Sequence, residues 1–261
     1  MMAALWVSKT GLNAQDVALR TISNNLANVS NVGFKRDRAV FQDLLYQIQR
    51  QPGGLSSQDT ALPAGLQLGS GVQVAGTQKV FTEGTLQITE QPLDVAIDGR
   101  GFFQVQLPDG TTAYTRAGEF HLDSSGQIVT SDGHPVLPAL TVPANATSIT
   151  IGEDGTVSAS LGGQAAVSQL GVLQTADFIN PAGLQAIGNN LFQETGSSGT
   201  PQVGSPGTNG LGRVKQGSLE TSNVSVVEEL VNMITAQRAY EMNSKVVSAA
   251  DQMLQFVTQN V

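Results

Sequence analysis

Side chains able to perform acid–base or nucleophilic chemistry are few in this chain, and their spacing does not bring them together. The two histidines, His121 and His134, lie in a strand-like segment, and neither has a serine and an acid in a triad-like pattern nearby. Cysteine is absent, which excludes disulfides, thiol nucleophiles and zinc–thiolate sites. The acidic residues lie mostly at turns, where carboxylates cap backbone N–H groups. We therefore predict no catalytic residues, no metal site and no cofactor.

Two short motifs come closest to ligand-binding patterns. The run Gly99-Arg-Gly101 lacks the third glycine and the following helix of a dinucleotide-binding loop. The run Lys35-Arg-Asp-Arg38 is the one basic cluster, and we interpret it as a solvated or interface face near a helix end. The net charge of −8 argues against a protein that binds nucleic acid through its phosphates. Neither a nucleic acid nor a small-molecule substrate is predicted.

The two ends of the chain differ in composition from its middle. Residues 1–50 and 220–261 contain only two of the 29 glycines and none of the ten prolines. Because both residue types destabilise helix interiors, the ends are predicted to be helical and the middle is not. Asp/Gly turn signals separated by short alternating runs, such as residues 103–107, predict half-buried antiparallel strands in the middle. The predicted fold class is α+β, with long N- and C-terminal helices packed together as in a coiled coil.

We divide the chain into five parts on the basis of these shifts in composition. They are an N-terminal helical segment (1–46), an extended or β connecting region (47–95), a β-rich outer domain (96–204), a return connector (205–224) and a C-terminal helix that pairs with the N-terminal segment (225–261).

The helical ends carry patterns that predict packing against another segment or another copy of the chain. Leucines recur every seven residues in the N-terminal segment, which predicts one apolar stripe. A capping box, Ser225-x-x-Glu228, starts a C-terminal helix that should reach residue 258 and measure about 50 Å. Opposite net charges, +3 in residues 1–50 and −3 in residues 220–261, favour association of the two ends. That association can occur within one chain, as an antiparallel helix pair, or between copies.

Asparagines cluster where the N-terminal helix should end. Asn24, Asn25, Asn28 and Asn31 suit a helix terminus, and Gly33 can adopt the left-handed conformation that often follows one. Their amides can also join backbone groups across a tight junction between subunits.

The stretch that holds these asparagines, residues 23–28 and 33–36, resembles the N-terminal signature of the bacterial flagellar rod and hook family. Two further stretches resemble the same family. One is residues 97–103 with 114–118 and Phe120, and the other is residues 216–224 with 237–240, Asn243 and 251–253. Together they cover nearly the whole chain.

Within that family, the length, the opening residues 4–11 and the stretch around residues 47–65 are most similar to the subunits of the distal rod. The resemblance implies a structural subunit, not an enzyme, that polymerises into a helical tube and transmits motor torque to the hook. It implies export by the flagellar type III apparatus without a cleaved signal peptide, and assembly in the basal body across the periplasm. The implied partners are further copies of the chain, proximal rod and hook subunits, the surrounding ring proteins and the export apparatus.

The residues expected at the assembly interface are apolar or amide side chains of the two helical ends. They are Leu5, Leu12, Leu19, Ile22, Leu26, Asn24, Asn25, Asn28, Phe34, Leu230, Ile234, Tyr240, Val247 and Leu254. A rod-specific stretch, marked by Gln47, Pro52, Leu62 and Gly65, is expected to pack against a neighbouring subunit and resist bending.

Two other classes of function are weighed against this one. A β-rich surface adhesin or carbohydrate-binding module with helical ends has the same element order. An enzyme acting on cell-wall glycan would need two carboxylates about 5–10 Å apart in a cleft. The low content of charged and aromatic residues, 13% and 5%, disfavours a sugar cleft.

We predict that both helical ends are mobile in an isolated monomer. Ordering a residue costs about 1–2 kcal/mol, and the apolar stripes find most of their cover on other copies. Amide hydrogen exchange on a monomer should be fast in residues 1–35 and 225–261 and slow in residues 95–205. Strong protection of both ends would instead show a stable helix pair within one chain.

Overall fold

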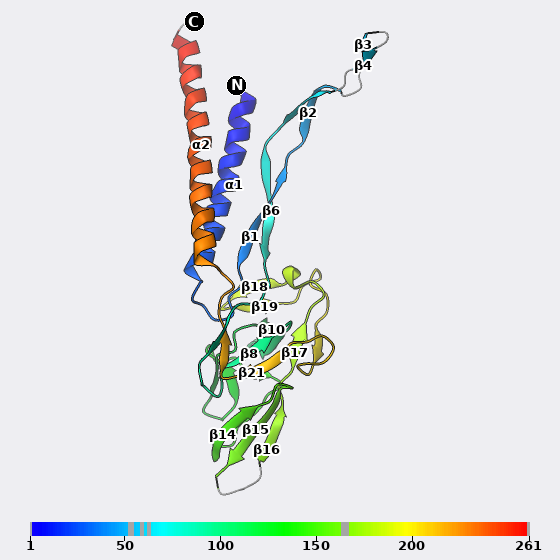
Figure 1. The fold of residues 1–261 in the computed structure, drawn as a ribbon, viewed down its shortest axis with the longest axis vertical. Helices are drawn as coiled ribbons and strands as arrows, with labels where there is room; N and C mark the ends of the chain where they lie inside the picture. Colours follow the sequence, from blue (N-terminus) through cyan, green and yellow to red (C-terminus); the bar gives the residue numbers. More distant parts are fainter. Residues whose placement is uncertain (1, 52–54, 58–59, 62–63, 163–166, 260–261) are drawn as a thin grey trace. The chain divides into compact units, whose positions relative to one another are not determined.

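A computed structural model describes residues 2–51, 55–57, 60–61, 64–162 and 167–259 (Figure 1). The chain forms two compact units. The first unit consists of Met1–Leu26, Asp37–Gln78 and Ser225–Val261, and the second of Ala27–Arg36 and Lys79–Val224. No helix among the described residues has the length and apolar character needed to cross a membrane. The five-part division made from composition stays a prediction.

Two long helices, α1 (Met2–Ala27) and α2 (Val226–Gln259), run antiparallel in the first unit (Figure 1). Their backbones approach closely, since a Cβ atom added to Gly11 would lie 3.0 Å from Nδ2 of Asn243. The more covered side of α2 carries a residue every seven positions that is small or polar, namely Glu229, Ala236, Asn243 and Ala250. The predicted α+β class, with helical ends packed together, is confirmed.

The rest of the first unit is a two-stranded ribbon. Strand β1 (Asp37–Asp43) pairs with β6 (Val72–Lys79), β2 (Tyr46–Arg50) pairs antiparallel with β5 (Leu66–Gly69), and β3 (Leu55–Ser57) pairs antiparallel with β4 (Thr60–Ala61). The ribbon contacts α1, because the backbone N–H of Val72 donates to Oγ1 of Thr10 at 3.3 Å. Helix α1 is therefore covered by α2 and by the ribbon.

The second unit is built on an antiparallel seven-stranded sheet. Its order is β18 (Gln185–Gly188), β19 (Leu191–Gln193), β10 (Thr112–Thr115), β9 (Phe102–Gln106), β17 (Thr175–Asp177) and β20 (Gln202–Gly204), with β13 (Val136–Leu137) also paired to β9. A separate three-stranded antiparallel sheet contains β14 (Ala146–Ile151), β15 (Thr156–Leu161) and β16 (Val167–Val172). A short 3₁₀ turn, η1 (Pro181–Gly183), precedes β18.

Three two-stranded antiparallel pairs complete the second unit. They are β11 (Phe120–Leu122) with β12 (Ile128–Thr130), β8 (Val95–Asp98) with β21 (Arg213–Gln216), and β7 (Leu86–Ile88) with β22 (Ser218–Glu220). The last two pairs place the segment that enters the β-rich region beside the segment that leaves it.

Strand β9 is buried on both faces. Phe103 and Val105 belong to one apolar cluster, whereas Phe102 packs in another beside Phe178, with ring centroids 5.9 Å apart. The alternating sequence of residues 103–107 predicted a half-buried strand, and for β9 that prediction was wrong. Gln104 is buried as well, because strands flank β9 and an apolar cluster covers each of its faces.

Candidate assembly interface

The apolar side chains at the start of α2 lie on the side away from α1. Val227, Leu230, Val231 and Ile234 are 73%, 43%, 57% and 51% exposed. At about 100° per residue they fall opposite the line of small and polar residues that α2 turns toward α1. We call these four residues the α2 patch. A contiguous apolar surface of this kind is typical of a binding face.

The structure places the other predicted interface residues in three settings. The leucine stripe is half-buried along one side of α1, and the same holds for Ile22, Asn28 and Val247. Exposed positions are Asn24 and Tyr240, besides Leu230 and Ile234 of the α2 patch. Buried positions are Asn25 and Phe34.

Asn25 makes a joint within the chain. Its Nδ2 donates to the carbonyl of Asp37 at 2.8 Å, and the N–H of Asp37 donates back to Oδ1 at 2.8 Å. The amide thus fixes the end of α1 to the start of β1.

The rod-specific stretch is described only in part. Gln47 is exposed in β2 and Gly65 is half-buried just before β5. Pro52 and Leu62 lie outside the described residues, as does the side chain of Leu254.

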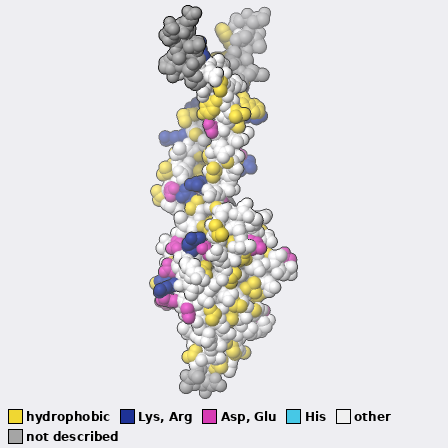
Figure 2. All heavy atoms as spheres, turned by 90° about the vertical axis from the view of Figure 1, so that its right-hand side faces the viewer, with side chains coloured by type: hydrophobic (Ala, Val, Ile, Leu, Met, Phe, Trp, Pro, Cys, Tyr) yellow, Lys and Arg dark blue, Asp and Glu magenta, His cyan; other side chains and the backbone are white. Residues whose placement is uncertain are grey.

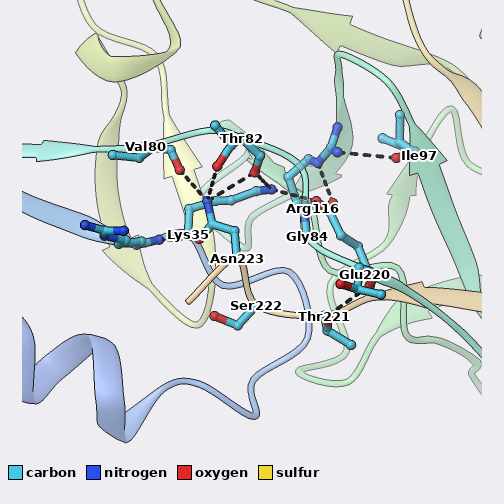
Figure 3. Close-up of polar contacts among 12 residues, drawn as sticks. Lys35, Val80, Thr82, Gly84, Ile97, Arg116, Glu220, Thr221, Ser222 and Asn223 are labelled. Atoms are coloured by element: carbon cyan, nitrogen blue, oxygen red, sulfur yellow. Dashed lines mark hydrogen bonds and ion pairs between the residues drawn. The ribbon is translucent and has the colours of Figure 1, made fainter. Parts of the chain in front are cut away.

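A buried ionic cluster in the second unit joins distant parts of the sequence (Figure 3). Glu220 accepts hydrogen bonds from Nζ of Lys35 at 2.6 Å and from Nε of Arg116 at 2.7 Å. Its Oε1 atom also accepts from the N–H of Gly84 at 2.8 Å. All three charged side chains are at most 5% exposed. One carboxylate therefore holds two cations in a site that water does not reach.

Backbone carbonyls accept further hydrogen bonds from the two cations. Nη1 of Arg116 donates to Gly99 and Gly101, both at 2.8 Å, and Nζ of Lys35 donates to Thr82 at 2.7 Å. Buried charges are tolerated when they are both paired and hydrogen-bonded in this way.

The environment moves the pKa values of the cluster in directions with clear causes. Burial by itself would raise the pKa of Glu220, but the charges and hydrogen bonds of Arg116 and Lys35 outweigh it and hold that pKa below its ordinary value. Burial lowers the pKa of Lys35, against the opposing attraction of Glu220. Glu220 is consequently ionised in the folded unit at neutral pH.

Beside the cluster, Asn223 ties together three points where the chain passes between the two units (Figure 3). Its Oδ1 accepts from the N–H of Arg36 at 2.8 Å, and its Nδ2 donates to the carbonyls of Val80 and Thr82 at 2.8 and 3.1 Å. The N–H of Val80 also donates to the carbonyl of Arg36 at 2.9 Å. One amide therefore holds together three segments of the second unit, at Arg36, at residues 80–82 and at Asn223 itself.

Gly33 brings the Lys35 segment close enough to join this network. It has a φ of +69°, and a Cβ atom there would lie 2.5 Å from the backbone nitrogen of Ala117. Its N–H donates to the carbonyl of Glu220 at 2.8 Å. Only glycine allows both the left-handed conformation and this approach.

The basic cluster at residues 35–38 was interpreted from sequence as a solvated or interface face, and for Lys35 this was wrong. Sequence reasoning also missed Glu220, Arg116 and Asn223 as a connected site. A signal was present, because these three residues and Lys35 together fall in the three separate stretches that carried the family resemblance, and the structure brings those stretches together. Among the described residues, no group of three His, Asp or Glu side chains could hold a metal ion.

Comparison with known proteins gives matches at both ends and in the middle. The family described as "Flagella basal body rod protein" matches residues 5–35, "Flagellar hook protein FlgE/F/G D1 domain" matches residues 96–159, and "Flagellar basal body rod FlgEFG protein C-terminal" matches residues 215–260.

Several relatives that match over nearly the whole chain carry the printed name flagellar basal-body rod protein FlgG. One from Buchnera aphidicola (subsp. Schizaphis graminum) is 54% identical over 99% of this chain and 100% of its own length. Others from Caulobacter vibrioides and Bacillus subtilis are 49% and 37% identical, covering 99% and 98% of this chain and 99% and 97% of their own lengths.

We predict that Glu220→Gln destabilises the second unit by about 3–5 kcal/mol, because Lys35 and Arg116 would remain buried without a counter-charge. Chemical denaturation measures this loss. Glu153→Gln is the matched control: Glu153 pairs with Arg213 at 3.0 Å, but both side chains are more than 70% exposed. Its cost should be about 0–1 kcal/mol. Equal effects of the two substitutions would contradict the assigned role of the cluster.

The lowered pKa of Glu220 also predicts a pH dependence. Its folded pKa lies below the unfolded value of about 4.3, so the unfolded state binds the proton first as the pH falls. The stabilisation is complete above the unfolded pKa and is lost as the pH falls through the folded pKa. From about pH 6 to about pH 3, the wild-type unit should lose more unfolding free energy than the Glu220→Gln variant.

Proposed function

The chain belongs to the family of flagellar basal-body rod proteins, and from that membership we propose that it polymerises into the helical tube of the distal rod. As a rod subunit it is a structural component of the flagellar basal body. The proposed tube carries motor torque to the hook, with the terminal helices inside and the β-rich unit outside.

The observation that carries this proposal is the α2 patch. Four aliphatic side chains project from a long helix on the side that its own chain leaves open. Burying such a side chain completely contributes about 1.5–3 kcal/mol, so a small patch repeated on every copy can drive association. Contacts between different surfaces of successive copies do not close and produce an open helical filament.

The proposed partners follow from that position in the basal body. They are further copies of the chain, proximal rod and hook subunits, the surrounding ring proteins and the flagellar export apparatus. Export would occur without a cleaved signal peptide, and assembly would take place across the periplasm. The interface residues named from the sequence remain part of this proposal.

The comparisons give no support to the adhesin or carbohydrate-binding alternative. Every relative named above carries a rod protein's name. A structural role accounts for the buried cluster as well, since its charged groups form ion pairs and hydrogen bonds with one another and with the backbone of the same chain.

We predict that Leu19→Asp blocks polymerisation and leaves the second unit folded. Leu19 belongs to the half-buried stripe of α1, where a carboxylate would lose hydration on assembly. Electron microscopy shows whether tubes form, and chemical denaturation measures whether the second unit remains folded. Leu122→Asp, at an exposed position of the second unit, is the control and should still assemble. Normal tubes from Leu19→Asp would show that the stripe is not an interface.

We also predict that deleting residues 47–64 leaves polymerisation intact but gives tubes that curve. This stretch is proposed to pack against a neighbouring subunit, so its loss should remove resistance to bending. Curvature is measured in electron micrographs beside wild-type tubes prepared in the same way. Straight tubes from the deletion variant would overturn the role given to this stretch.

A further inference from the structure

A second apolar surface in the first unit lies between the first turns of α1 and the ribbon. It is a groove of about 520 Å³ lined by Leu5, Trp6, Val7, Lys9, Gln47, Leu68, Gly69 and Ser70. Trp6 and Leu68 are about half exposed, and so is Leu66, two residues before Leu68 on β5. Figure 2 shows further exposed hydrophobic side chains on the first unit, on the side of the ribbon that faces the viewer.

We propose that this groove receives the α2 patch of the next copy of the chain. The inference rests on the polymerisation proposed above and names the two surfaces that meet in it. Val227, Leu230, Val231 and Ile234 occupy positions i, i+3, i+4 and i+7 of a helix. Those are the positions from which a helix anchors its apolar side in a groove.

The helix register keeps patch and groove apart within one chain. Gly11 lies opposite Asn243 in the antiparallel pair, so Leu230 stands level with the C-terminal part of α1. The groove is level with residues 5–9 of α1, about 25 Å away along the helix axis at about 1.5 Å per residue. A second copy displaced along that axis can bring the two surfaces together.

A contact of this kind uses different surfaces on the two copies. A pair of copies joined in this way still has a free groove on one copy and a free patch on the other. The contact is heterologous and open, as a growing filament requires.

Charge supports the same pairing. The groove lining contains one cation, Lys9, and no carboxylate, and Nζ of Lys9 lies 5.6 Å from the ring centroid of Trp6. The α2 segment from residue 226 to 237 contains no cation, and Glu228 is exposed beside the patch, whereas Glu229 is buried on the covered side of the helix. The cation at the groove can therefore meet a carboxylate beside the patch, which favours this orientation over patch-to-patch contact.

Crosslinking tests the pairing directly, because the chain has no cysteine of its own. Chains carrying Leu68→Cys and chains carrying Val231→Cys are mixed, assembled into tubes and treated with a short bis-maleimide. Covalent dimers are expected from the mixture and not from either variant alone. In the matched control, Ile179→Cys, which is 76% exposed in the second unit, replaces Leu68→Cys and should give no dimers.

The outcomes separate this inference from the proposed function. Tubes that form from the mixture without crosslinked dimers would overturn the patch-to-groove contact and leave polymerisation standing. Failure of the wild-type chain to form tubes would overturn the proposed function itself. Crosslinking within a verified monomer that carries both substitutions would show that patch and groove meet in one chain, which also overturns the inference. If chains with Leu68→Cys and Val231→Cys do not assemble, chains with Trp6→Cys and Leu230→Cys are mixed instead. Covalent dimers from this second mixture would support the contact, and tubes without dimers would overturn it.

Discussion

One buried carboxylate, that of Glu220, fixes the part of the second unit from which the connecting strands leave. It binds Lys35 and Arg116, which are 185 and 104 residues away in the sequence. Charge-assisted hydrogen bonds are short and directional, so the cluster fixes the positions of three chain segments as well as holding them together. Asn223, three residues further on, extends that control to Arg36, Val80 and Thr82.

The cluster also accounts for conformational features that would otherwise look unrelated. Gly33 must be glycine because the segment carrying Lys35 passes within contact distance of the segment carrying Arg116. The pairing of β7 with β22 delivers Glu220 to the same place. Buried ionic hydrogen bonds therefore fix these segments relative to one another within the second unit.

In the first unit, the small and the large apolar residues of α2 lie on different sides of the helix. Residues such as Ala236 and Ala250 lie on the covered side of α2, which allows the close approach to α1 seen at Gly11. Large residues such as Val231 and Ile234 face outward. A monomeric helical protein would bury the larger side chains first, because they contribute more on burial. The reverse arrangement supports the proposed contact of these side chains with other copies.

The sequence by itself determined the secondary-structure elements that depend on patterns among neighbouring residues. Exclusion of glycine and proline from both ends predicted two helices, and the Ser225 capping pattern located the start of α2 closely. The same argument was wrong for the end of the N-terminal segment, because residues 37–50 form β1 and β2 although they contain neither glycine nor proline. The three family-like stretches were also visible without a structure.

Only the tertiary structure decided which of these segments contact one another. Lys35 looked like a solvated cation because its counter-charge is 185 residues away, and no local pattern reports such a partner. Residues 103–107 alternate like a half-buried strand, yet β9 is covered on both faces because its neighbours come from distant parts of the chain. Helix periodicity marks apolar positions, but whether α1, the ribbon or another copy covers them depends on packing and register, which are set by contacts between segments far apart in sequence.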